Sequence, residues 1–129
     1  MKPTITINFS KEDTGYSAHA NVPGHFIATE SETFEGLQQS ILEALNLAFE
    51  DEDYHYKLPD LKFQYDLESF FDFYKIINAK ALASRIGMNQ SLLAQYIKGI
   101  KQPSDTQTQR ILKGIHDIGK ELSDARFLM

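Results

Sequence analysis

The chain contains no cysteine and no long apolar run. Without cysteine it has no disulfide, no thiolate metal ligand and no thiol nucleophile, and a reducing compartment fits this composition. No stretch of about 18 apolar residues is present, so no segment is expected to span a membrane. Residues 1–10 lack the apolar core of a secretory signal, which favours a cytoplasmic protein. The 129 residues, 42% hydrophobic and 24% charged, predict one folded domain or two small ones.

Charged residues are unevenly distributed along the chain. Residues 1–66 contain four basic and twelve acidic side chains, and residues 67–129 contain nine basic and six acidic ones. The first part therefore carries a net charge of −8 and the second +3, although the whole chain carries −5. This asymmetry favours two modules, of which the acidic one meets a basic partner and the basic one meets phosphates. Chance scatter of surface charge is the alternative, and the change of structural pattern at the same boundary disfavours it.

Residues 1–66 have the pattern of a small sheet with one helix. The segments with strand character are Thr4–Phe9, Tyr16–Val22, His25–Thr29 and Leu61–Tyr65. Turn chemistry at Ser10–Gly15 and Pro23–Gly24 separates the first three. Thr33 is expected to cap a helix, whose apolar face is Phe34, Leu37, Ile41, Leu45 and Ala48. The acidic run Glu50–Asp53 opposes the helix dipole, so the helix end is expected to fray, and the element order is β-β-β-α-β.

Residues 67–129 are predicted to be helical throughout. The expected elements are a helix with the stripe Leu67, Phe70, Phe71, Tyr74 and Ile77, the helices Ala79–Ile86 and Gln90–Lys98, and a last helix with the face Ile111, Ile115, Ile118 and Leu122. Gly87 is expected to end the second helix and Asn89 to cap the third. Phe73 falls off the first stripe and is a candidate interface residue, and Gly114 and Gly119 are expected to loosen the last helix. The fold class is α+β, with a partner-binding module at residues 1–66 and an all-α domain at residues 67–129.

Two short helices around a tight turn carry the main functional signal. The side of the second helix away from the expected core presents Gln90, Ser91, Ala94 and Gln95. An amide side chain can pair with adenine through two hydrogen bonds, so this face suits the edges of bases. The cations Lys80, Arg85, Lys98 and Lys101 are candidates for phosphate contacts. This layout is that of a helix-turn-helix, with Asn89–Lys98 as the recognition helix.

The segment from Leu67 to Leu122 resembles the lambda-repressor-like (XRE-type) helix-turn-helix domains. The matching marks are Leu82-Ala83, Ile86-Gly87, Asn89-Gln90-Ser91 and Gly99-Ile100-Lys101-Gln102-Pro103-Ser104. The resemblance implies base contacts by Gln90, Ser91 and Gln95, and phosphate contacts by Asn89 and Asn78. The chain departs from the family at Ile97, where a glutamate is common, and at Leu92, which is apolar for a groove-facing position. Leu92 either meets a thymine methyl group or is packed.

Residues 1–66 resemble the HicB antitoxin fold. The marks are Gly15-Tyr16-Ser17, Val22-Pro23-Gly24-His25-Phe26 and a threonine-capped helix that ends in acids. The resemblance implies a truncated relative of ribonuclease H in the order β-β-β-α-β, often followed by a DNA-binding domain. Members neutralise a small basic ribonuclease toxin, HicA, and repress their own operon as oligomers. The expected partners are therefore double-stranded DNA, a HicA-like toxin and a second copy of the chain, with no membrane.

Two other functions stay open, and one is disfavoured. Ribonuclease H chemistry needs clustered carboxylates around metal ions, and the strands Thr4–Phe9 and Tyr16–Val22 contain no acid, so no catalytic residue is expected. The four histidines are scattered, so neither a metal site nor a cofactor is expected. The chain is alternatively an orphan regulator whose first module serves for oligomerisation or ligand binding. For Gln90 and Gln95, the alternative is a helical unit that packs only against protein.

Overall fold

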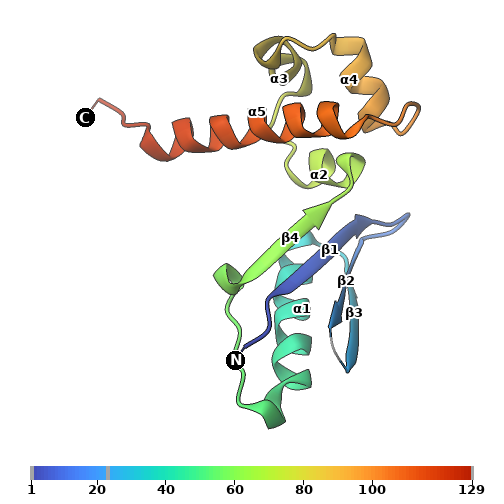
Figure 1. Cartoon of the computed structure of the whole chain (residues 1–129), viewed down its shortest axis with the longest axis vertical. Coiled ribbons are helices and arrows are strands. Elements are labelled where there is room, and N and C mark those ends of the chain that lie inside the picture. The colour runs from blue at the N-terminus through green and yellow to red at the C-terminus, as the bar shows by residue number, and fades with distance from the viewer. Residues whose placement is uncertain (1, 23, 129) are drawn as a thin grey trace. The chain divides into compact units, whose positions relative to one another are not determined.

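The computed structural model describes residues 2–22 and 24–128, and it divides into two compact units, Met1–Phe73 and Tyr74–Met129 (Figure 1). The predicted α+β class is confirmed, because the described residues form one four-stranded mixed sheet and five α-helices. The division follows Phe73, whereas the sequence pattern places it after Asp66. The difference arises because α2 (Leu67–Phe73) packs on strand β1 of the first unit. No helix in the described part is both long and apolar enough to cross a bilayer.

The sheet of the first unit has the strand order β3-β2-β1-β4. Its strands are β1 (Ile5–Lys11), β2 (Tyr16–Val22), β3 (His25–Ser31) and β4 (Leu61–Tyr65). They are antiparallel except for β4, which runs parallel to β1 after the crossover through α1. Gly15 turns the chain between β1 and β2 with φ 77°, and a Cβ there would lie 2.6 Å from the carbonyl oxygen of Ser31. Of the second predicted turn, Pro23 lies outside the described residues, and Gly24 has φ 81°.

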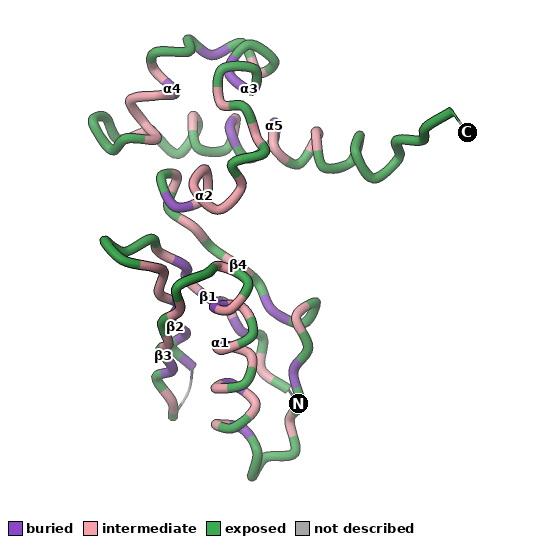
Figure 2. The backbone as a smooth tube through the Cα atoms, turned by 180° about the vertical axis from the view of Figure 1, so that it is seen from behind, coloured by how far each residue is buried: buried purple, intermediate pink, exposed green. Residues whose placement is uncertain are grey.

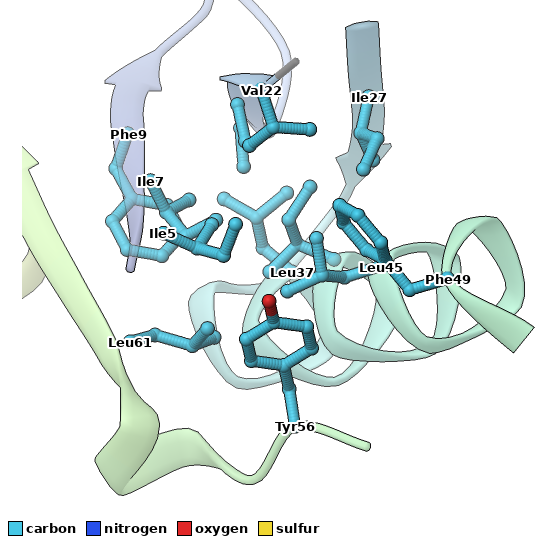
Figure 3. Close-up of a cluster of buried hydrophobic side chains, with 13 residues drawn as sticks. Ile5, Ile7, Phe9, Val22, Ile27, Leu37, Leu45, Phe49, Tyr56 and Leu61 are labelled. Carbon is cyan, nitrogen blue, oxygen red and sulfur yellow. The ribbon is translucent and has the colours of Figure 1, made fainter. Parts of the chain in front are cut away.

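Helix α1 (Phe34–Ala48) covers one face of this sheet, and Figure 2 shows buried positions on both layers. The hydroxyl of Thr33 accepts a hydrogen bond from the N–H of Gly36 at 3.0 Å, so the predicted N-cap is confirmed. The core between the layers contains Ile5, Ile7, Phe9, Leu37, Ile41, Leu45, Phe49 and Tyr56 (Figure 3). Burial raises the pKa of the Tyr56 hydroxyl, which donates to the carbonyl oxygen of Pro3 at 2.9 Å. The acidic run after α1 forms the short 3₁₀ helix η1 (Glu50–Glu52), and a second one, η2 (Leu58–Asp60), precedes β4.

Helix α2 is attached to the sheet by polar and aromatic contacts. The buried hydroxyl of Ser69 accepts from the N–H of Lys11 at 2.9 Å, and Asp72 accepts from the Lys11 ammonium at 3.1 Å and from the Tyr16 hydroxyl at 3.0 Å. Phe73 stacks on Phe34 with 4.3 Å between ring centroids. Its interpretation as an interface residue is therefore corrected, since its ring completes the aromatic cluster that fastens α2.

The second unit is built from α3 (Ala79–Ile86), α4 (Gln90–Ile97) and α5 (Asp105–Asp124). Its core consists of Leu82, Ala83, Met88, Leu93 and Ile111. The predicted stripe through Tyr74 and Ile77 does not continue as one helix, because α2 ends at Phe73 and Asn78 already caps α3. Leu122, predicted on the apolar face of the last helix, is 70% exposed, so this part of the predicted face is not buried within the unit.

Candidate nucleic-acid interface

Asparagine caps begin α3 and α4, and one glycine ends α3 at the turn between them. The Asn78 side-chain oxygen accepts from the N–H of Ala81, and that of Asn89 accepts from the N–H of Leu92, each at 3.0 Å. Each cap satisfies a backbone donor that has no partner within its own helix. Gly87 ends α3 with φ 72°, a left-handed conformation that a side chain disfavours. Local sequence therefore determines both ends of this turn.

Helix α5 supports the turn from the side through Arg110 and Gly114. The Arg110 guanidinium donates to the carbonyl oxygens of Ile86 at 2.9 Å and Gly87 at 3.2 Å, and to the Gln107 side chain at 2.7 Å. These carbonyls lie at the C-terminus of α3, where a cation also meets the negative end of the helix dipole. A Cβ on Gly114 would overlap the side chain of Ile86, so the glycine permits close packing of α3 on α5.

The exposed face of α4 carries the side chains that the sequence assigns to base reading. Gln90 and Ser91 are exposed and Gln95 is half-buried. The Gln90 amide nitrogen donates to the Ser84 hydroxyl at 3.1 Å, which orients this carboxamide at the start of α4. Leu93 is 1% exposed and faces the core, whereas Leu92 is half-buried beside it. The face thus offers carboxamide and hydroxyl groups without a formal charge.

Three of the four predicted cations are exposed, and the fourth forms an ion pair within the unit. Lys80, Lys98 and Lys101 are exposed. Arg85 instead forms a bidentate ion pair with Glu121 of α5, at 3.0 and 3.1 Å, so its guanidinium already has an anionic partner within the unit. Asn78 and Asn89 are exposed caps whose oxygens are used by the backbone. Their amide nitrogens are donors, which suits phosphate oxygens.

Four residues that shape this unit were missed by sequence reasoning. Met88 is buried in the turn, Arg110 caps α3, Gly114 admits Ile86, and Glu121 binds Arg85. The periodicity of α5 places Gly114 next to the apolar face, so the sequence pattern could have predicted a close helix contact at this glycine. The contacts of Arg110 and Glu121 join residues that are distant in sequence, and no local pattern marks them.

The first unit leaves the other face of its sheet uncovered by α1. Register pairs Asn8 with His19 on β2 and with Gln64 on β4, which forms a polar row across that face. Beside this row lies an open hollow of about 570 Å³, lined by Glu12, Ser17, Ala18, His19, Phe26, Ala28, Thr29 and Glu30. Glu12 accepts from the Ser17 hydroxyl at 2.6 Å, and Ser17 is the register partner of Glu30. The hollow thus combines two carboxylates with Phe26, which is 69% exposed.

Among the described residues, no three histidine, aspartate or glutamate side chains are grouped so that they could hold a metal ion. The His19 ring lies 6.1 Å from that of Phe26, and the His25 ring lies 5.0 Å from that of Phe49. Comparison with protein-family models, with curated proteins and with solved structures finds no match to this chain.

Proposed function

We propose that this protein is a DNA-binding autorepressor of the HicB antitoxin type, with α3 and α4 as its helix-turn-helix. The observation that carries the proposal is the uncharged carboxamide face of α4, which ends at the exposed cation Lys98. Gln90, Ser91 and Gln95 read base edges in the major groove, and Lys80, Lys98 and Lys101 contact the phosphates on either side. Asn78 and Asn89 add phosphate contacts at the two helix N-termini, where the dipole favours an anion.

Several features support this arrangement over a unit that only packs against protein. The apolar side of α4 is already used, since Leu93 is buried in the unit's own core. The opposite side contains amides and a hydroxyl, which contribute little to a hydrophobic protein interface. These groups match the hydrogen-bond donors and acceptors at the edges of bases. The turn that sets the angle between α3 and α4 is braced by Arg110, so the reading face is held on a rigid support.

We propose that the acidic first unit binds the protein partner. Residues 1–66 have a net charge of −8, so a basic protein is attracted and nucleic acid is repelled. The open sheet face offers the side-chain amides of Asn8 and Gln64. It also offers two carboxylates and the exposed ring of Phe26. We propose that a small basic ribonuclease toxin docks on this unit and is inhibited by occlusion of its RNA-binding surface.

The first experiment measures binding to DNA from upstream of the protein's own gene and to scrambled DNA of equal length, at two salt concentrations. Sequence-selective binding that weakens with salt is the expected result. Equal weak binding to both DNAs would overturn the repressor role and would favour a protein-packing unit.

The second experiment tests the antitoxin role. The protein is co-expressed with the product of the neighbouring gene, and the growth of the cells and the survival of their RNA are measured. Neutralisation of a small basic ribonuclease supports the antitoxin assignment. Selective DNA binding without any neutralised neighbour would instead favour an orphan regulator.

A further inference from the structure

The hollow on the uncovered face of the sheet lies over a small residue of β3, Ala28. Phe26, Ala28 and Glu30 share this face, because successive strand residues point to opposite sides of a sheet. All three are exposed, and the register places Ala28 opposite His19 on β2. The methyl group of Ala28 is thus flanked by three larger side chains, and this difference in size accounts for the depression between them.

The two ends of the hollow differ in their chemistry. At one end, Glu30 is the register partner of Ser17, whose hydroxyl donates to Glu12 at 2.6 Å, so both carboxylates line the same end. At the other end, Phe26 is 69% exposed, and its ring lies 6.1 Å from that of His19. With a rise of about 3.3 Å per residue, Phe26 and Glu30 are about 13 Å apart along the strand. The hollow is therefore elongated, acidic at one end and aromatic at the other.

The carboxylates of Glu12 and Glu30 form no ion pair with a basic side chain in residues 2–22 and 24–128, which the structure describes. Two like charges that line one hollow repel each other, and residues 1–66 around them carry a net charge of −8. A bound cation relieves this repulsion. Within the same described residues, no third acidic or histidine side chain joins them to form a metal site, so an organic cation is the better match.

We propose that this hollow binds a small organic cation with a guanidinium head and an aliphatic body. The head lies against the carboxylates of Glu12 and Glu30, and the body extends over Ala28 to the ring of Phe26. A guanidinium is planar and has N–H donors along its edges, so it can bind more than one carboxylate, whereas an ammonium acts as a point charge. A guanidinium is also more weakly hydrated, which lowers the cost of removing water from it at an open site.

The size of the hollow favours a free molecule over a single side chain carried by another protein. Its volume of about 570 Å³ lies within the range of about 300–1,000 Å³ that is usual for small-molecule sites. A few convergent polar groups beside an apolar surface are also the usual composition of such sites. Because the hollow is open to solvent, we expect modest affinity, with a dissociation constant of about 1 mM or lower. The ligand class is therefore that of small alkyl guanidines.

The first test titrates the isotope-labelled full chain with butylguanidinium at constant ionic strength and follows the backbone amides by NMR. Saturable shifts are expected on β2 and β3 around Ser17 and Ala28. Butylammonium keeps the body and changes the head, and methylguanidinium keeps the head and lacks most of the body. Each is expected to bind at least about tenfold more weakly. Equally tight binding of butylammonium, or shifts that do not saturate, would overturn the proposal.

The second test uses variants that change the volume or the charge of the hollow. Ala28→Leu fills it without altering the charge and is expected to abolish saturable binding, whereas Ala28→Ser keeps the small volume and is expected to retain it. Glu30→Gln is expected to weaken binding about tenfold, since it removes one carboxylate partner of the head. The matched control is Glu43→Gln, an exposed position on α1, which covers the opposite face of the sheet. Retained binding in Ala28→Leu, or equal losses in Glu30→Gln and Glu43→Gln, would contradict the site.

A third arm separates a free guanidine from an arginine side chain on another protein. A blocked tripeptide with a central arginine is expected to bind more weakly than butylguanidinium, and tighter binding of the peptide would overturn the assignment to a free ligand. This site goes beyond the proposed function, and its tests use neither DNA nor a toxin. Butylguanidinium binding by a protein that neutralises no neighbour would contradict the antitoxin role and leave the site standing. Neutralisation by a protein that binds no guanidine would do the reverse.

Discussion

The Arg110 guanidinium lies 2.9 Å from the carbonyl oxygen of Ile86, so a side chain of α5 completes the C-terminus of α3. It also reaches the carbonyl oxygen of Gly87 at 3.2 Å, within the turn that leads to α4. This one cation thus connects the helix that supports the unit to the turn that orients the proposed reading face.

Replacing Arg110 by methionine is expected to destabilise the second unit by about 2 kcal/mol. The change keeps much of the apolar stem but removes charged hydrogen bonds to two carbonyl oxygens, each worth about 1.5–3 kcal/mol when well formed. Urea unfolding followed by circular dichroism measures the loss. Arg126→Met is the control, because Arg126 is exposed and bonds only to carbonyls near the end of its own helix. An equal, small effect of both variants would contradict a bracing role for Arg110.

Replacing Gln90 by alanine is expected to cost about 1–3 kcal/mol of operator affinity and to relax selectivity at one base position. The physical reason is the loss of a bidentate carboxamide at the start of α4. Binding to a set of operators that differ at single base pairs measures this change. Ser84→Ala serves as the control, since it removes the hydrogen-bond partner of Gln90 at 3.1 Å but leaves the amide in place. Unchanged selectivity in Gln90→Ala would show that this residue does not read a base.

Replacing Lys98 by glutamine is expected to weaken binding to all DNA sequences alike. A lysine at a phosphate releases a counterion, so its removal should reduce the slope of log K against log salt by about 0.9. Fluorescence anisotropy at several salt concentrations provides the slope. Lys120→Gln on α5 removes the same charge from the same unit at an exposed site, and it is expected to leave the slope unchanged. If the two variants behave alike, Lys98 makes no phosphate contact.

The contacts of Asp72 predict a loss of stability at alkaline pH. Its hydrogen bonds raise the pKa of the Tyr16 hydroxyl and of the Lys11 ammonium above their ordinary values of 10.0 and 10.5. A raised pKa stabilises the fold fully below the unfolded value, and this contribution disappears as the pH rises through the folded value. Melting temperatures measured between about pH 7 and pH 11 should therefore fall at the upper end.

Asp72→Asn is expected to lower the melting temperature at neutral pH and to flatten the alkaline decrease. Glu68→Gln lies on the same helix and keeps the bonds of Asp72 to Tyr16 and Lys11, so most of the decrease should remain in that variant. A decrease of equal steepness in the wild type and in Asp72→Asn would exclude this cluster as its source.

Local signals in the sequence predicted the elements well because the physics of each is local. Thr33, Asn89 and Ser104 each accept from a backbone N–H within the next three residues, so their capping depends on no distant contact. Alternation along β1 and β2 places one set of side chains in the core for the same reason, since successive strand residues point to opposite faces. The position of the exposed carboxamides on α4 follows from the helical period alone.

Contacts between distant residues decided what the sequence left open. The Phe73 ring stacks on that of Phe34, a contact that helical periodicity does not predict. Arg85, which the sequence predicts at a phosphate, forms an ion pair with Glu121, 36 residues away. The sequence alone does not distinguish the roles of Gly114 and Gly119, which lie in the same helix. In the structure, only Gly114 is required for the contact with Ile86.

The sequence by itself therefore determined the order of strands and helices, their caps and the chemistry of the proposed DNA-reading face, because these depend on periods and on bonds within a few residues. The tertiary structure alone decided where the first unit ends, which cations are engaged and which side of α5 is left uncovered. Those properties depend on which segments meet across the chain, and a side chain's partner there is set by packing rather than by its neighbours in sequence.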